Sequence, residues 1–246
     1  MIYIDLNCDM GEGAGNDAAI MPYITSANIA CGFHAGDEDT MWQTIRIAKT
    51  YGVAIGAHPS YPDREHFGRK EMRLPNSDIY TIITQQLSNL NAIAQKEDVL
   101  LNHVKPHGAL YNQAAKDMSL AKAIVNAVKD FNPRLKLVGL SGSYLITAAD
   151  DAGLQSVSEV FADRTYTAEG HLTPRSQANA LIEEETESLQ QVLQMVLHST
   201  VATTSGKTIP IKAETICLHG DGLHAAAFAK RIYTALLAQG IGLKSF

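Results

Sequence analysis

Cysteine is scarce in this chain of 246 residues, and its placement excludes two common uses of the residue. Cys8, Cys31 and Cys217 are odd in number and far apart, and none belongs to a C-x-x-C pair. A zinc ribbon and a thioredoxin-like redox motif are therefore excluded. Each cysteine stands at or just past an expected strand end, where a nucleophile is conceivable, but we expect small buried core side chains.

Long apolar runs and an excess of basic residues are also missing. No apolar stretch approaches the ~20 residues of a membrane helix, and the start has no basic segment followed by an apolar one. The 26 acidic residues outnumber the 20 basic ones, for a net charge of −6. Nucleic acids and anionic membranes attract basic surfaces, so neither is expected as a partner. We expect a cytoplasmic protein.

Several familiar catalytic motifs are absent as well. Gly206-Lys207-Thr208 resembles the end of a phosphate loop, but Val201 stands where the first glycine belongs and Pro210 where a helix should begin. The glycines after residue 10 miss the G-x-G-x-x-G spacing of dinucleotide-binding folds. Neither a G-x-S-x-G elbow nor an H-E-x-x-H zinc motif occurs. These enzyme classes therefore receive no support.

Alternating apolar and helical segments are present along the whole chain. The apolar segments predict seven strands, at 2–6, 26–31, 53–57, 100–105, 136–140, 157–161 and 214–218. Helical periodicity lies over 40–50, from a cap at 76–78 to 93, and over 121–128, 143–149, 183–197 and 223–238, with Asp39 as the expected cap of the first helix. Such alternation demands parallel strands. We predict one α/β domain over 1–246, a seven-stranded TIM-like barrel, with an open doubly wound sheet as the alternative.

Two spans lack this periodicity. The segment 163–180 is expected to be an active-site loop, and 198–213 to be a turn between two short strands. Neither resembles a domain linker.

Polar clusters follow five of the predicted strands, at 7–12, 31–37, 57–63, 105–112 and 218–221. The carboxyl ends of parallel strands share one face, where sites are built. The pattern therefore predicts an enzyme whose catalytic residues are Asp9, Glu12, His34, Asp37, His58, Lys105, His107 and His219. The expected substrate or anion contacts are Asn7, Arg64, Arg69, Asn112 and Arg164.

Each of these residue types has an alternative explanation. Asp9 suits acid–base work or metal binding, but could be a solvated loop acid or a helix cap. Asp9, His58 and another strand-end histidine could together hold a divalent metal, which is left open. Lys105 could bind phosphate or carboxylate, or it could neutralise a buried Asp9 or Glu159.

Six stretches carry a resemblance to a known family: DLNCDMGEG (5–13), SANIACGFHAGD (26–37), GVAIGAHPSYPD (52–63), HVKPHGALYN (103–112), EVFADRTY (159–166) and ICLHGD (216–221). Together they resemble the LamB/YcsF family, assigned as one of the three subunits of the prokaryotic 5-oxoprolinase. The resemblance implies a seven-stranded barrel related to polysaccharide deacetylases. It also implies opening of 5-oxo-L-proline to L-glutamate with ATP and Mg²⁺, together with the two other components, subunits B and C.

Two departures from the family pattern concern the rim of the pocket. The stretch between Gly15 and Ala27 is shorter than the family leads us to expect, and Ser60 stands where glycine is common. Two other functions remain open. One is a metal-dependent hydrolase that acts alone on an amide or acetyl-sugar, and the other is a non-catalytic subunit that binds a small acid.

Overall fold

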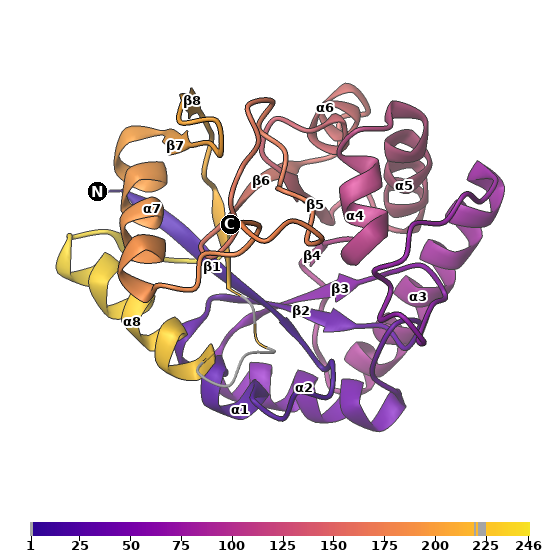
Figure 1. The fold of residues 1–246 in the computed structure, drawn as a ribbon. Coiled ribbons are helices and arrows are strands. Elements are labelled where there is room, and N and C mark those ends of the chain that lie inside the picture. Colours follow the sequence, from indigo (N-terminus) through magenta and orange to yellow (C-terminus); the bar gives the residue numbers. More distant parts are fainter. Residues whose placement is uncertain (1, 219, 221–224) are drawn as a thin grey trace.

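The computed structural model describes residues 2–218, 220 and 225–246, and within them seven parallel strands close into a barrel (Figure 1). The strands are β1 (Tyr3–Met10), β2 (Ser26–Ala30), β3 (Ala54–His58), β4 (His103–Val104), β5 (Lys136–Leu140), β6 (Ser156–Phe161) and β9 (Thr215–Leu218). Neighbours in this order pair, and β9 pairs with both β6 and β1, which closes the ring. The predicted TIM-like barrel is confirmed.

Helices surround the barrel on its outer side (Figure 1). They are α1 (Asp17–Ile20), η1 (Met21–Tyr23), α2 (Glu38–Tyr51), α3 (Asn76–Lys96), α4 (Gly108–Ala114), α5 (Met118–Phe131), α6 (Tyr144–Asp151), α7 (Glu185–His198) and α8 (Ala225–Ala238). Each longer helix buries an apolar stripe, as α3 does with Ile79, Ile83 and Leu87. None of the helices over the described residues is long and apolar enough to cross a membrane.

Three local expectations needed correction. The cap of α2 is Asp37 rather than Asp39, because Asp37 accepts a hydrogen bond from the Thr40 amide at 2.8 Å. At α3 the chain becomes helical directly after Pro75, so residues 76–78 form its first turn instead of a cap. Helix α4 was not predicted, since its seven residues lie inside a polar cluster and are too few to show periodicity.

The segment 198–213 forms an antiparallel hairpin of β7 (Thr200–Ala202) and β8 (Thr208–Pro210), as expected. Gly206 and Lys207 lie in its connecting turn, away from any helix N-terminus. A further short strand, β10 (Gly242–Leu243), pairs with the first residues of β1.

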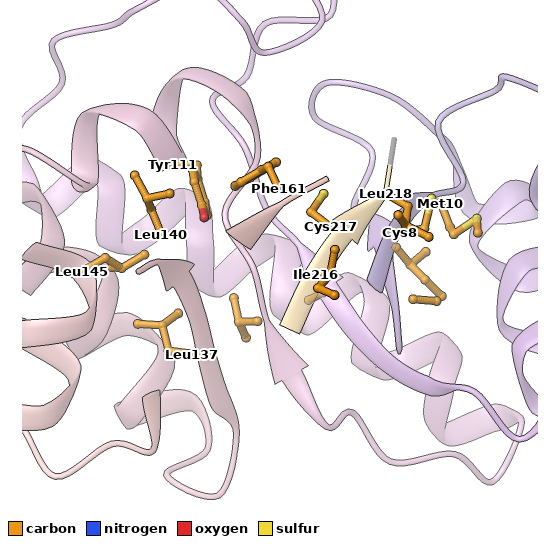
Figure 2. Packing of buried hydrophobic residues seen from close by; sticks show 14 of the residues in the cluster. Cys8, Met10, Tyr111, Leu137, Leu140, Leu145, Phe161, Ile216, Cys217 and Leu218 are labelled. Atoms are coloured by element: carbon orange, nitrogen blue, oxygen red, sulfur yellow. The ribbon is translucent and has the colours of Figure 1, made fainter. Parts of the chain in front are cut away.

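Strand β1 extends four residues beyond its predicted end, so Asp9 lies within a strand rather than after one. Side chains alternate along it. Leu6, Cys8 and Met10 join the buried apolar cluster, whereas Asn7 and Asp9 hydrogen-bond to residues inside the barrel. Figure 2 shows Cys8, Met10 and Leu218 together on one side of β9, with Cys217 on the other side.

The barrel interior is consequently polar. The Asp5 carboxylate accepts hydrogen bonds from Ser26 at 2.7 Å and Thr25 at 2.5 Å, and Asn28 donates to Asn7 at 2.7 Å. His103 contacts the Asn28 side-chain oxygen at 2.8 Å. Buried polar groups are tolerated when they are hydrogen-bonded to one another. This network supports the charged residues at the barrel mouth from below.

Candidate active site

The strand-end clusters meet at one mouth of the barrel, where they line a cavity of about 60 Å³. Its lining residues are Asp9, Glu12, His58, Arg69, Lys105, Pro106, His107, Gly108, Tyr111, Asn112, Phe161, Leu172, Arg175 and Gly220. Residues that follow β1, β3, β4, β6 and β9 thus share one small pocket. His219, which was predicted to be catalytic, lies outside the described residues.

Lys105 is buried between two carboxylates. Its Nζ lies 2.9 Å from Oδ1 of Asp9 and 2.8 Å from Oε1 of Glu159, and it also donates to Asn7 at 3.1 Å. Burial acts to lower the pKa of Lys105, but the attraction of the nearby anions outweighs it and raises the pKa well above its usual value. Lys105 is therefore a permanent cation, and these three contacts can occupy its three N–H donors.

Asp9 joins this lysine to a histidine. While its Oδ1 faces Lys105 and Asn28, its Oδ2 lies 3.3 Å from Nε2 of His58. Burial acts to raise the pKa of Asp9, but His58 and Lys105 together hold it well below its ordinary value. The pocket thus contains an ionised carboxylate with cationic or polar partners on both oxygens.

Two members of this network, Glu159 and Tyr111, were not predicted as site residues. Glu159 is fully buried, and its two oxygens accept hydrogen bonds from Asn7 at 2.9 Å and from the Tyr111 hydroxyl at 2.6 Å. Burial, and then the charge of Glu159, raise the pKa of Tyr111 well above its usual value. The available signal was an acid inside an otherwise apolar strand, which indicates a buried ion pair.

Three histidines and Glu12 form a second cluster beside Asp9. The rings of His34 and His107 stack with their centroids 3.8 Å apart. Oε1 of Glu12 lies 3.1 Å from Nε2 of His34, 3.3 Å from Nδ1 of His107 and 3.9 Å from Nε2 of His58. Burial lowers the pKa of His34 to about 3, and burial likewise places the pKa of His107 well below its usual value. His34 and His107 are therefore neutral near pH 7.

The hydrogen bonds of His58 and His107 assign their tautomers. Nδ1 of His58 lies 2.7 Å from the Lys105 carbonyl, and Nε2 of His107 lies 2.9 Å from the Phe67 carbonyl. Carbonyls only accept, so both of these nitrogens carry hydrogen. In two neutral rings, the remaining nitrogens are therefore lone-pair acceptors, yet they face one another at 2.9 Å. A shared proton or a bound cation must lie between them.

The donor set also fits a divalent metal ion. One ligand atom from each of Glu12, His34, His58 and His107 lies within 4.8 Å of the others. Imidazole and carboxylate ligands suit zinc and related ions, and metal-bound histidines commonly donate their other N–H to a carbonyl. His58 and His107 have this carbonyl contact, and buried Nδ1 of His34 has no hydrogen-bond partner among the described residues.

Other predicted site residues lie elsewhere or have other contacts. Asp37 caps α2 and is not among the pocket-lining residues. Arg64 donates to the Gly32 carbonyl at 2.7 Å and the Gly36 carbonyl at 2.9 Å, which fixes the loop after β2. Buried Arg164 donates to the Thr173 carbonyl at 2.6 Å and the Ala180 carbonyl at 3.2 Å, which orders the loop after β6.

The remaining predicted contacts do reach the pocket or its base. Asn7 binds Lys105 and Glu159 from below, while Asn112 and Arg69 line the pocket itself. Arg175 also lines it and was missed, because its segment has no periodic pattern from which its position could be inferred. The cysteines are buried and free, as expected for core residues, and burial raises the pKa of Cys217 well above its usual value.

Comparison with known proteins agrees with this architecture. A lactam utilization protein from Thermus thermophilus is 40% identical, with a TM-score of 0.93 over 100% of both chains. A family 4 carbohydrate esterase from Streptomyces lividans is 14% identical, with a TM-score of 0.51 over 99% of this chain and 91% of the esterase. The catalytic domain of a peptidoglycan N-acetylglucosamine deacetylase from Eubacterium rectale is 11% identical, with a TM-score of 0.52 over 100% of this chain and 87% of the deacetylase.

The last two similarities concern the fold alone and confirm the expected relation to deacetylase-type barrels. The sequence of residues 4–246 matches the LamB/YcsF family. The chain therefore belongs to the LamB/YcsF family.

Proposed function

We propose that this protein hydrolyses a small lactam, and specifically that it opens 5-oxo-L-proline to L-glutamate. The observation that carries the proposal is the ionised Asp9, held between Lys105 and His58 at a small closed-in pocket. The similarity to a lactam utilization protein over the full chain supports the substrate class. The volume of about 60 Å³ suits a single small ring better than a sugar chain.

The His58–His107 contact supplies the proton chemistry in this proposal. Hydrolysis of a lactam needs a proton removed from water and a proton delivered to the ring nitrogen as the C–N bond breaks. A proton shared across the 2.9 Å contact would serve both needs, since one ring accepts while the other donates. Asp9, at 3.3 Å from His58, stabilises the charged form of the pair.

Lys105 acts in this scheme by positioning Asp9 rather than by binding phosphate. Its contacts with Asp9, Asn7 and Glu159 can use all three of its donors. Its positive charge nevertheless remains close to the pocket and favours negative charge that develops on the substrate oxygen.

We further propose that ring opening is coupled to ATP, with Mg²⁺, and needs subunits B and C of a 5-oxoprolinase. An unactivated amide is difficult to open, and phosphorylation of its oxygen would create a leaving group. The motif around Lys207 lies in a hairpin turn, so nothing in the described residues offers a phosphate loop for the nucleotide. We therefore expect the isolated chain to be almost inactive.

A second candidate function is a metal-dependent amide hydrolase that acts without partners. The facing lone pairs of His58 and His107 favour it, because a divalent ion between them would satisfy both nitrogens. Glu12 and His34 would complete the ligand set. A bound ion would polarise the amide carbonyl or activate water.

The test is glutamate formation from 5-oxo-L-proline by the isolated chain and by the chain with its two presumed partner subunits, each with and without ATP. The proposed function predicts turnover only in the assembled, ATP-supplied reaction. Turnover by the isolated chain without ATP, abolished by a chelator and restored by Zn²⁺, would support the second candidate. No turnover in any arm would contradict both and leave a small-acid-binding subunit.

A further inference from the structure

The catalytic pocket opens into a larger cleft through a wall that contains two arginines. The outer cleft has a volume of about 470 Å³ and shares five lining residues with the inner pocket. The shared residues are Arg69, Gly108, Asn112, Leu172 and Arg175. Arg69 comes from the segment between β3 and α3, and Arg175 from the segment between β6 and α7.

Positive charge predominates along this outer cleft. Four basic residues line it, against two acids, Glu71 and Asp117. The basic residues are Arg69, Lys116, Arg164 and Arg175. The positive charge of Arg69 also reaches the histidine cluster, where it contributes to lowering the pKa of His34 after burial and His58. The junction between the two cavities is thus a cationic zone in a chain of net charge −6.

The inner pocket has the opposite requirement. Asp9 and Glu12 line it, so an anionic substrate is repelled unless cations compensate for its charge. A guanidinium group binds a carboxylate through two parallel hydrogen bonds, which fixes orientation as well as charge. Two arginines at the edge of the pocket can therefore hold a carboxylate outside while a neutral ring enters.

We propose that Arg69 and Arg175 form a subsite for the carboxylate of a lactam acid, so that the enzyme selects anionic lactams over neutral ones. This inference rests on the proposed function, because it assigns the charged half of the same substrate. Arg164 supports the subsite indirectly. Its hydrogen bonds to the Thr173 and Ala180 carbonyls hold the segment that contains Arg175.

Calorimetric binding to the isolated chain tests the subsite without any turnover. The ligands are 5-oxo-L-proline, its neutral analogue 5-oxo-L-prolinamide, and 2-pyrrolidinone, which lacks the carboxylate. The variants are Arg69→Gln and Arg175→Gln. The matched control is Arg134→Gln, because Arg134 is exposed and precedes β5 at the opposite end of the barrel.

We expect each subsite variant to bind 5-oxo-L-proline about 10- to 100-fold more weakly, and Arg134→Gln to bind like wild type. The two neutral ligands should bind weakly to wild type and be insensitive to the substitutions. Arg175→Lys should restore part of the affinity, since it keeps the charge but loses the paired geometry. Melting temperatures establish that the variants are folded.

Several results would overturn the subsite. They are equal affinity of wild type for the acid and its amide, undiminished binding in both arginine variants, or no binding of 5-oxo-L-proline at all. The ligand comparison on wild type decides the matter even if a variant does not fold. Failure of the proposed function looks different, because charge-selective binding would persist while the assembled system formed no glutamate.

Discussion

The amino group of Lys105 lies 2.9 Å from one oxygen of the Asp9 carboxylate, and the other oxygen of that carboxylate faces His58 at 3.3 Å. Asp9 therefore couples a permanently charged lysine inside the barrel to the histidine cluster at its mouth. This relationship makes stability and proposed activity depend on the same few buried charges.

Removal of the lysine charge is expected to destabilise the fold. Lys105→Met leaves Asp9 and Glu159 buried without their cation, which costs about 3–5 kcal/mol. Urea unfolding measures the loss. The double variant Lys105→Met/Glu159→Gln should recover part of it, because one of the two unpaired charges is gone. An unchanged free energy of unfolding would contradict the buried ion pair.

The Tyr111 hydroxyl is expected to stabilise Glu159 measurably. Tyr111→Phe removes a 2.6 Å hydrogen bond to a fully buried carboxylate and should lower the free energy of unfolding by about 1.5–3 kcal/mol. Tyr80→Phe is the matched control, since the Tyr80 hydroxyl donates to Asp130 in an exposed position. Equal effects of the two substitutions would mean that Glu159 does not depend on Tyr111.

Asp5 is expected to give stability an unusual dependence on pH. Burial raises the pKa of Asp5 to about 6 from its usual 3.8. Between these values the folded state holds a proton that the unfolded state has lost, so the contribution of Asp5 falls as pH rises from about 4 to 6. The stability difference between wild type and Asp5→Asn should therefore decrease by about 3 kcal/mol across this window.

Urea unfolding at several pH values from about 4 to 7 measures that difference. Asp151→Asn, at an exposed position in α6, is the control and should show no such trend. A difference that stays constant with pH would show that Asp5 is ionised in the folded protein throughout.

Much of this architecture follows from local sequence patterns. Seven apolar runs and intervening helical periodicity predict the barrel, and the polar groups that follow those runs predict the common mouth. Asp9 was placed after β1 because polar residues were taken to mark its end. The alternation of Leu6, Cys8 and Met10 with Asn7 and Asp9 instead continues the strand, with one face toward the helices and the other toward a polar interior.

The functions of individual arginines could not be predicted in the same way. Arg64 and Arg69 lie close together in one loop, yet Arg64 is bound to carbonyls of the β2 loop while Arg69 lines the pocket. Arg175 reaches the same pocket from a segment without periodicity. Loop residues are positioned by contacts between distant segments, and a single sequence does not reveal such contacts.

The histidine cluster allows a direct choice between a shared proton and a metal ion. If a divalent ion binds there, Zn²⁺ at about 100 times its dissociation constant should stabilise the protein by about 2.7 kcal/mol. His107→Gln should abolish this gain in melting temperature. His66→Gln should not, because His66 pairs with Asp63 outside the cluster. Absence of both calorimetric binding and stabilisation would leave the shared proton.

Turnover of the assembled system with the Asp9→Asn chain tests the central claim most directly. Asparagine keeps the shape of Asp9 but removes the charge that stabilises the His58–His107 pair. Glutamate formation from 5-oxo-L-proline, with ATP and both partner subunits present, is predicted to fall about 10²- to 10⁴-fold while the variant stays folded and still assembles. Wild-type turnover by the assembled Asp9→Asn enzyme would contradict the account and move the chemistry away from this barrel mouth.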